Sequence, residues 1–157
     1  MFLIQTESGL LNAFRPRDRK QVELPKDLAF PLFVRDYLAW TEPAGVRTYL
    51  VLTEPHSKRP MGITFRRDQQ GGGALSAHMC DWCHAYGSSD EIGLLTAEAS
   101  SKRRVGVHLC LDLRCGEKLE TAANLAGRNP RVLAGRLVER MVRFAQEGLG
   151  IDFVPAA

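Results

Sequence analysis

Four cysteines in two close pairs constrain how this chain can fold more than any other feature. The first pair is Cys80-Asp-Trp-Cys83, and the second pair, Cys110-Leu-Asp-Leu-Arg-Cys115, follows after 26 residues. A Cys-x-x-Cys turn directs two sulfurs to one point, and a second close pair completes the tetrahedron of thiolates that Zn²⁺ prefers. A site with four protein ligands has no open position for water or substrate. We therefore predict one structural zinc ion, bound by Cys80, Cys83, Cys110 and Cys115.

Other uses of cysteine compete with this interpretation. A redox pair at Cys80 and Cys83 requires a helix N-terminus in a βαβ unit, and it leaves the second pair without a role. Buried thiols, disulfides and an iron–sulfur cluster are further alternatives, although ferredoxin-type cysteine runs are absent. His78, His84 and His108 lie within a few residues of a cysteine. Four sulfurs already fill a tetrahedral site. We therefore expect His78 and His108, each two residues before a cysteine, to support a ligand or to be partly exposed strand residues.

The residues between and after the two pairs predict the type of finger. Residues 92–97 and 104–109 have the composition of two strands joined by a polar turn. After Cys115, residues 117–126 have helix-forming composition. A cysteine knuckle, a hairpin and a second pair that leads into a helix occur in this order in a treble-clef zinc finger. The helix N-terminus then lies near Cys115 and stabilises its thiolate.

The remaining segments predict an α+β fold. Residues 46–53 and 61–65 are rich in β-forming residues and flank a turn, which predicts a β-hairpin. A short helix is expected to begin at Thr6 or Ser8, either of which can cap it. The predicted segments are an N-terminal α+β lobe at 1–70, a glycine-rich loop at 71–77, a treble-clef zinc finger at 78–128 and a C-terminal helix with tail at 129–157, all within one compact domain.

The C-terminal segment predicts an amphipathic helix. Asn129 and Pro130 are typical of an N-cap and a first helical residue. Apolar side chains recur after them at helical spacing, so one face is expected to contact a core. A basic stripe with the same spacing either contributes to partner binding or is a solvated flank. The apolar stripe is Leu133, Leu137, Met141 and Phe144, and the basic stripe is Arg136, Arg140 and Arg143.

Composition and charge exclude several classes of protein. The sequence has 21 basic and 18 acidic residues, a net charge of +3 that one zinc ion and four thiolates reduce to about +1. This balance disfavours a histone-like nucleic-acid binder. No apolar run approaches the ~20 residues of a membrane-spanning helix, and no secretory signal is evident, so we expect a cytoplasmic protein with reduced thiols. We also expect no enzyme activity and no small-molecule substrate, because no phosphate loop, nucleophile elbow, paired catalytic carboxylates or open metal site is present.

The finger resembles the treble-clef domain of the FusB-type elongation-factor-G-binding proteins, a family linked to fusidic acid resistance. The resemblance rests on Cys80-Asp-Trp-Cys83 and on His108-Leu-Cys110-Leu-Asp-Leu-Arg-Cys115, and it is strongest over residues 78–118. It implies that the four cysteines bind zinc and that the domain binds elongation factor G and helps it leave a stalled ribosome. FusB-type resistance proteins also carry an N-terminal helical bundle, for which this sequence shows no counterpart. Weaker likenesses upstream are Tyr37-Leu-Ala-Trp40, Tyr49-Leu-Val-Leu52 and Gly62-Ile-Thr-Phe-Arg66.

Two functions follow as hypotheses. The first is a non-enzymatic, zinc-containing adaptor that binds elongation factor G at the translation machinery. The alternative is a small RNA-binding zinc protein that acts on ribosomal or structured RNA. In the second case, residues 15–20, residues 102–104 and the C-terminal helix would contact phosphates. In the first case, residues 15–20 are only a solvated helix face.

Overall fold

The computed structural model describes residues 1–54, 59–68 and 77–151, which form both helices and strands. This mixture confirms the predicted α+β class. The helices are α1 (Glu7–Asn12), α2 (Pro16–Arg19), α3 (Cys115–Ala126) and α4 (Pro130–Arg143), and a π-helical turn, η1 (Phe144–Gly148), continues α4. The strands are β1 (Phe2–Ile4), β2 (Leu32–Val34), β3 (Tyr37–Thr41), β4 (Arg47–Thr53), β5 (Pro60–Arg67), β6 (His78–Met79), β7 (Tyr86–Gly87), β8 (Ile92–Ser100) and β9 (Arg103–Cys110).

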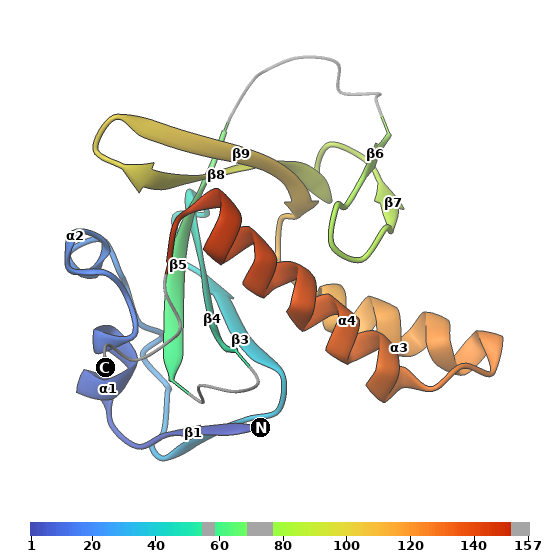
Figure 1. Ribbon diagram of the computed structural model, residues 1–157, viewed down its shortest axis with the longest axis horizontal. Coiled ribbons are helices and arrows are strands. Elements are labelled where there is room, and N and C mark those ends of the chain that lie inside the picture. Colours follow the sequence, from blue (N-terminus) through green and yellow to red (C-terminus); the bar gives the residue numbers. More distant parts are fainter. Residues whose placement is uncertain (55–58, 69–76, 152–157) are drawn as a thin grey trace.

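An antiparallel sheet of five strands, in the order β3-β4-β5-β8-β9, forms the centre of the molecule (Figure 1). β4 and β5 form the predicted N-terminal hairpin, with Leu50 opposite Ile63, and β8 and β9 form the hairpin predicted between the cysteine pairs. The two hairpins join where Arg66 and Arg67, at the end of β5, pair with β8. Strands from the N-terminal segment and from the finger therefore belong to one sheet.

The two faces of this sheet carry separate hydrophobic cores, because side chains alternate between the faces along each strand. Leu50 and Ile63 belong to the core that contains α4 and the four cysteines. Tyr49 and Val51 belong to the core on the other face, where they pack with α1 and Phe14. Figure 1 shows α1 and α2 on one side of β5 and α4 on the other. The finger therefore uses one face of the sheet and the N-terminal helices use the opposite face.

The N-terminal helix begins as predicted, at a threonine cap. The Thr6 hydroxyl accepts a hydrogen bond from the Gly9 amide at 3.0 Å, and Leu10 is fully buried. The basic segment that follows is not simply a solvated face. Arg15 forms a 3.0 Å ion pair with Asp18, which is only 4% exposed, and Arg15 also donates a hydrogen bond to the Glu98 carbonyl of β8. These contacts attach α2 to the central sheet.

The C-terminal helix also begins and packs as predicted. The Asn129 side chain accepts a hydrogen bond from the Arg131 amide, and Pro130 is the first helical residue. Leu137 and Met141 are buried in the core that contains the cysteines. The amphipathic pattern thus places one face of α4 against the finger.

Some predicted features lie outside the described residues. They are most of the turn between β4 and β5, most of the glycine-rich loop at 71–77 and the end of the C-terminal tail. Among the helices of residues 1–54, 59–68 and 77–151, none is long and apolar enough to cross a membrane.

Candidate metal centre

The first cysteine pair lies in a tight knuckle after β6. The Cys80 carbonyl accepts a hydrogen bond from the His84 amide at 2.9 Å, and the Cys80 amide donates to the Ala85 carbonyl at 2.9 Å. His84 has a φ of 63°, so the chain reverses through the left-handed region just after Cys83. The Cys83 amide donates to the Cys80 sulfur at 3.5 Å, as expected for a thiolate-binding turn. This geometry directs both sulfurs to the same side.

The second pair lies between β9 and α3. Cys110 is the last residue of β9, and Cys115 is the first residue of α3, as predicted for a treble clef. The Leu113 amide donates to the Cys110 carbonyl at 3.0 Å, and Leu113 has a φ of 54°. Asp112 accepts a hydrogen bond from the Arg114 amide at 3.0 Å, so it is a turn residue rather than a metal ligand. The helix N-terminus next to Cys115 favours its thiolate.

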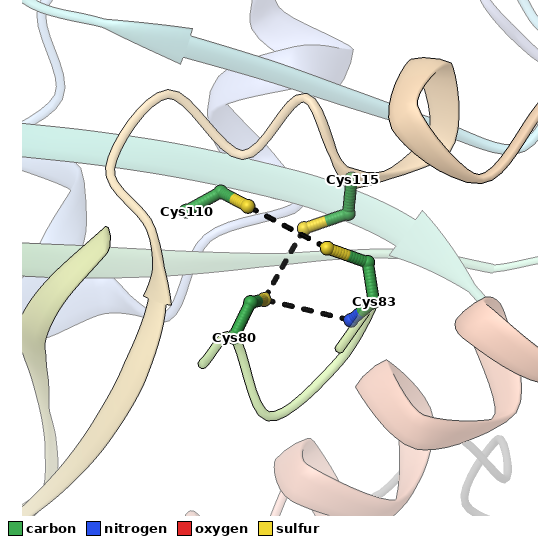
Figure 2. Close-up of side chains that lie close together, drawn as sticks. All are labelled: Cys80, Cys83, Cys110 and Cys115. Carbon is green, nitrogen blue, oxygen red and sulfur yellow. Dashed lines mark hydrogen bonds between the residues drawn. The ribbon is translucent and has the colours of Figure 1, made fainter. Parts of the chain in front are cut away.

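The four sulfurs meet at one buried point (Figure 2). The Cys80 and Cys115 sulfurs are 3.7 Å apart, the Cys83 and Cys110 sulfurs are 3.6 Å apart, and all four lie within 4.8 Å of one another. A zinc ion with Zn–S bonds of ~2.3 Å has sulfurs ~3.8 Å apart at the corners of its tetrahedron. The donor set and its spacing therefore fit one zinc ion, which confirms the predicted cofactor.

The ionisation of the four thiols also requires a cation. Hydrogen bonds from Cys110 and Cys115 lower the pKa of Cys80, and they lower the pKa of Cys83 to about 7. Hydrogen bonds with Cys110 and Cys80 raise the pKa of Cys115. Crowded thiols cannot all ionise alone because neighbouring negative charges repel. A divalent cation stabilises all four thiolates at once, so zinc binding releases protons and becomes tighter as the pH rises.

Two residues that sequence reasoning missed hold the cysteine loops in place. The Lys118 amine donates to the Cys110 sulfur at 3.1 Å and adds positive charge beside the thiolates. The hydroxyl of the half-buried Tyr37 donates to the Leu113 carbonyl and accepts from the Gly116 amide at 2.9 Å. Lys118 lies one helical turn after Cys115, which is a local signal. Tyr37 comes from β3, and no local pattern connects it with the second pair.

The histidines near the cysteines lie outside the donor cluster. Within the described residues, the atoms that could bind one metal here are the four sulfurs alone. His78 and His108 stack on each other instead, with ring centroids 5.3 Å apart and planes inclined by 16°. The His108 carbonyl accepts a hydrogen bond from the Asp81 amide at 2.8 Å, which joins the first knuckle to β9. This contact uses the backbone, so it does not depend on the imidazole.

We predict that His108→Ala retains one zinc ion per chain. The substitution removes the ring stack but none of the sulfur ligands, so the zinc affinity should fall by at most about 10–100-fold. Elemental analysis and competition with a chelator measure both quantities. Complete loss of zinc from this variant would show that the ligand set is wrong.

The basic stripe of α4 does not form one uniform surface. Arg136 and Arg143 are exposed, whereas Arg140 is half-buried and donates a hydrogen bond to the Trp82 carbonyl inside the first knuckle. Trp82 is itself buried between Phe65 and Phe144, with both ring centroids 5.9 Å away. Arg140 therefore attaches α4 to the zinc knuckle, and only the other two arginines are free to meet a partner at the surface.

Comparison with known proteins places this geometry in context. The sequence model described as the FBP C-terminal treble-clef zinc-finger matches residues 5–147. No curated protein matches the chain. The family match thus extends well beyond residues 78–118, which carry the strongest motif resemblance. It includes all five strands of the central sheet and the whole of α4.

Proposed function

Because the chain belongs to the family of the FBP C-terminal treble-clef zinc-finger, we propose that it is a non-enzymatic adaptor that binds elongation factor G. The zinc ion has a structural role in this proposal, since four buried cysteines leave it no open position for water or substrate. The adaptor acts at the translation machinery in the cytoplasm, where thiols remain reduced. The partner is inferred from the resemblance to FusB-type proteins.

An exposed apolar pair on the finger supports a protein partner. Met79 of β6 and Tyr86 of β7 are cross-strand partners, and they are 40% and 76% exposed. Side chains of such a pair lie on the same face of the hairpin. Tyrosine is enriched at protein interfaces because its ring is apolar and its hydroxyl is polar. Met79 directly precedes the zinc ligand Cys80, so the metal fixes the position of this hairpin.

Replacing the exposed tyrosine should weaken binding of elongation factor G. Truncation of a central interface residue typically costs about 2 kcal/mol or more, so Tyr86→Ala should raise the dissociation constant roughly thirtyfold. Phe33→Ala is a matched control, because Phe33 is 73% exposed and lies on β2, which pairs with β1 in a separate sheet. Calorimetry with purified factor measures both variants. Equal affinities for Tyr86→Ala and the parent protein would contradict this surface.

The exposed arginines of α4 should affect the rate of association. Charges at the rim of an interface mainly steer the encounter of the two proteins. We therefore expect the double variant Arg136→Gln with Arg143→Gln to bind elongation factor G more slowly and with a weaker salt dependence. Stopped-flow measurements over a salt series test this expectation.

A matched control for the arginine variant removes the same charge elsewhere. Arg17 and Arg128 are both exposed, so their double glutamine variant should associate at a rate closer to that of the parent protein. The zinc content and melting temperature of both variants should remain near parental values, because Arg140 keeps its contact with Trp82. An unchanged rate for the α4 variant at every salt concentration would make this helix a structural flank only.

The RNA-binding alternative is separated from the adaptor by nuclease treatment. The tagged protein is recovered from cell lysate with and without added nuclease, and the bound material is identified. Elongation factor G that remains bound after nuclease treatment supports the adaptor. Recovery of RNA without the factor supports the alternative.

A further inference from the structure

A small cavity lies between α2 and the central sheet, away from the zinc centre. Its volume is about 50 Å³, which exceeds the space that one water molecule needs. Three arginines line it from three strands: Arg47 of β4, Arg66 of β5 and Arg104 of β9. The N-terminal helices cover the neighbouring part of this face, where Tyr49 and Val51 are buried. The cavity therefore occupies the part of the sheet where the apolar lobe ends and polar side chains begin.

Three arginines meet at the cavity, and one of them has no acidic partner among the described residues. Arg47 and Arg66 lie directly opposite each other on adjacent strands, an arrangement that destabilises a sheet when the two charges have the same sign. Two of the three lining arginines have an acidic partner, because Glu42 lies 3.8 Å from Arg47 and Glu98 lies 3.2 Å from Arg104. Asp18, which also lines the cavity, pairs with Arg15 at 3.0 Å. Within the described residues, no carboxylate lies at ion-pair distance from Arg66.

A buried hydroxyl faces the same cavity without a partner. Thr64 lines the cavity and is only 8% exposed, and its hydroxyl has no hydrogen-bond partner among the described residues. A buried polar group that lacks a hydrogen bond costs about 1–3 kcal/mol. Thr96, another lining residue, uses its hydroxyl to donate to the Arg66 carbonyl at 3.4 Å. Thr64 is thus a donor with no acceptor, in a cavity that Arg66 also lines without an acidic partner among the described residues.

We propose that this cavity binds a phosphate group. Guanidinium groups and hydroxyls donate hydrogen bonds, and a phosphate presents several acceptor oxygens in different directions. A carboxylate has only two oxygens, which a single arginine can satisfy, so it would leave Thr64 and a second arginine without a partner. A phosphate can accept from Arg47, Arg66 and Thr64 together. It would also supply the acidic partner that Arg66 lacks and offset the repulsion between Arg66 and Arg47.

The phosphate can belong to a small molecule or to a nucleic-acid backbone. The cavity shares Arg66, Thr96 and Arg104 with a wider groove of about 460 Å³, which Arg67 also lines. This one further arginine allows a longer anionic chain to leave the cavity along the sheet, in a groove that Asp68 also lines. The two sources have the same chemistry at the cavity, and they differ only in what contacts the groove.

The first test is a calorimetric titration of the zinc-loaded protein with inorganic phosphate. We expect saturable binding of phosphate. Arg66→Gln should weaken this binding by at least about tenfold, because a hydrogen bond to a charged group is stronger than one between neutral groups. Arg103→Gln is the matched control. Arg103 precedes Arg104 on the same strand, so its side chain lies on the opposite face of the sheet, and its removal should leave phosphate affinity nearly unchanged.

A second variant separates phosphate binding from a structural role for the threonine. Thr64→Val keeps the shape of the side chain and removes the unpartnered hydroxyl. We expect this variant to melt at or above the parental temperature, because the substitution removes a buried hydroxyl whose lack of a hydrogen bond destabilises the fold. We expect its phosphate affinity to fall about tenfold at the same time. If the hydroxyl has only a structural role, Thr64→Val should instead melt at a lower temperature and bind phosphate with unchanged affinity.

A short single-stranded RNA identifies the source of the phosphate. Tight binding of RNA that inorganic phosphate displaces, and that Arg67→Gln weakens, assigns the site to a nucleic-acid backbone. Binding of inorganic phosphate alone assigns it to a small phosphorylated molecule. The proposal is overturned if neither probe binds saturably, or if Arg66→Gln and Thr64→Val both bind phosphate like the parent protein.

Discussion

Cys80→Ser should lose stoichiometric zinc and the cooperative melting of the finger. Structural zinc contributes an apparent ~10–16 kcal/mol at neutral pH, which is comparable with the whole net stability of a domain. Cys80 is fully buried and belongs to the same core as Leu50, Phe65 and Leu137. The loss of zinc should therefore loosen one face of the central sheet as well as the cysteine loops. Elemental analysis and calorimetric melting measure the two effects.

His108→Ala serves as the control for this substitution, because it alters the same region without removing a sulfur ligand. The core of the opposite face, which contains Leu10, Phe14 and Tyr49, is separate from the core that contains the four cysteines. Hydrogen exchange should therefore show more residual protection in α1 than in β8 and β9. A Cys80→Ser variant that melts like the parent protein would rule out a zinc-dependent fold.

Phe65→Ala should cause the largest loss of stability among single substitutions outside the ligand set. Phe65 is fully buried on β5, and its ring packs against Trp82 of the first knuckle and stacks on Phe144 at 5.8 Å. Truncation of such a residue leaves a cavity and typically costs about 3–5 kcal/mol. Because the ring connects the sheet, the knuckle and the end of α4, the zinc affinity should fall together with the melting temperature.

Two further variants make this result interpretable. Phe65→Leu retains most of the buried volume, so its loss of stability should be clearly smaller than that of Phe65→Ala. Phe33→Ala removes an exposed ring and should change the free energy of unfolding by no more than about 0.5 kcal/mol. If Phe65→Ala melts at the parental temperature, the aromatic cluster does not hold the finger on the sheet.

Local patterns were sufficient to predict much of this fold. The spacing of Cys80, Cys83, Cys110 and Cys115 predicts the ligand set, because the backbone turns of each pair involve only a few residues. The same is true of Thr6 at the start of α1 and of Asn129 at the start of α4, where the cap contacts an amide two or three residues ahead. The two hairpins are also local, since each pairs consecutive strands.

Long-range contacts were not predictable in the same way. The pairing of β5 with β8, which merges the N-terminal hairpin and the finger into one sheet, depends on register between distant segments. Tyr37 contacts the Leu113 carbonyl across 76 positions of sequence, and Arg140 contacts the Trp82 carbonyl across 58. Helical periodicity assigns Arg140 to the basic stripe, but it cannot show that the finger covers this residue. The arginines around Thr64 likewise come from separate strands.

Binding between the purified zinc-loaded protein and purified elongation factor G tests the central claim most directly. Calorimetry in the presence of nuclease should show saturable binding, and the same titration after removal of zinc with a chelator should show little or none. Zinc dependence is expected because the metal fixes the knuckle that carries Met79 and Tyr86. No binding by the zinc-loaded protein, or equal binding with and without zinc, would contradict the account of a zinc-scaffolded adaptor.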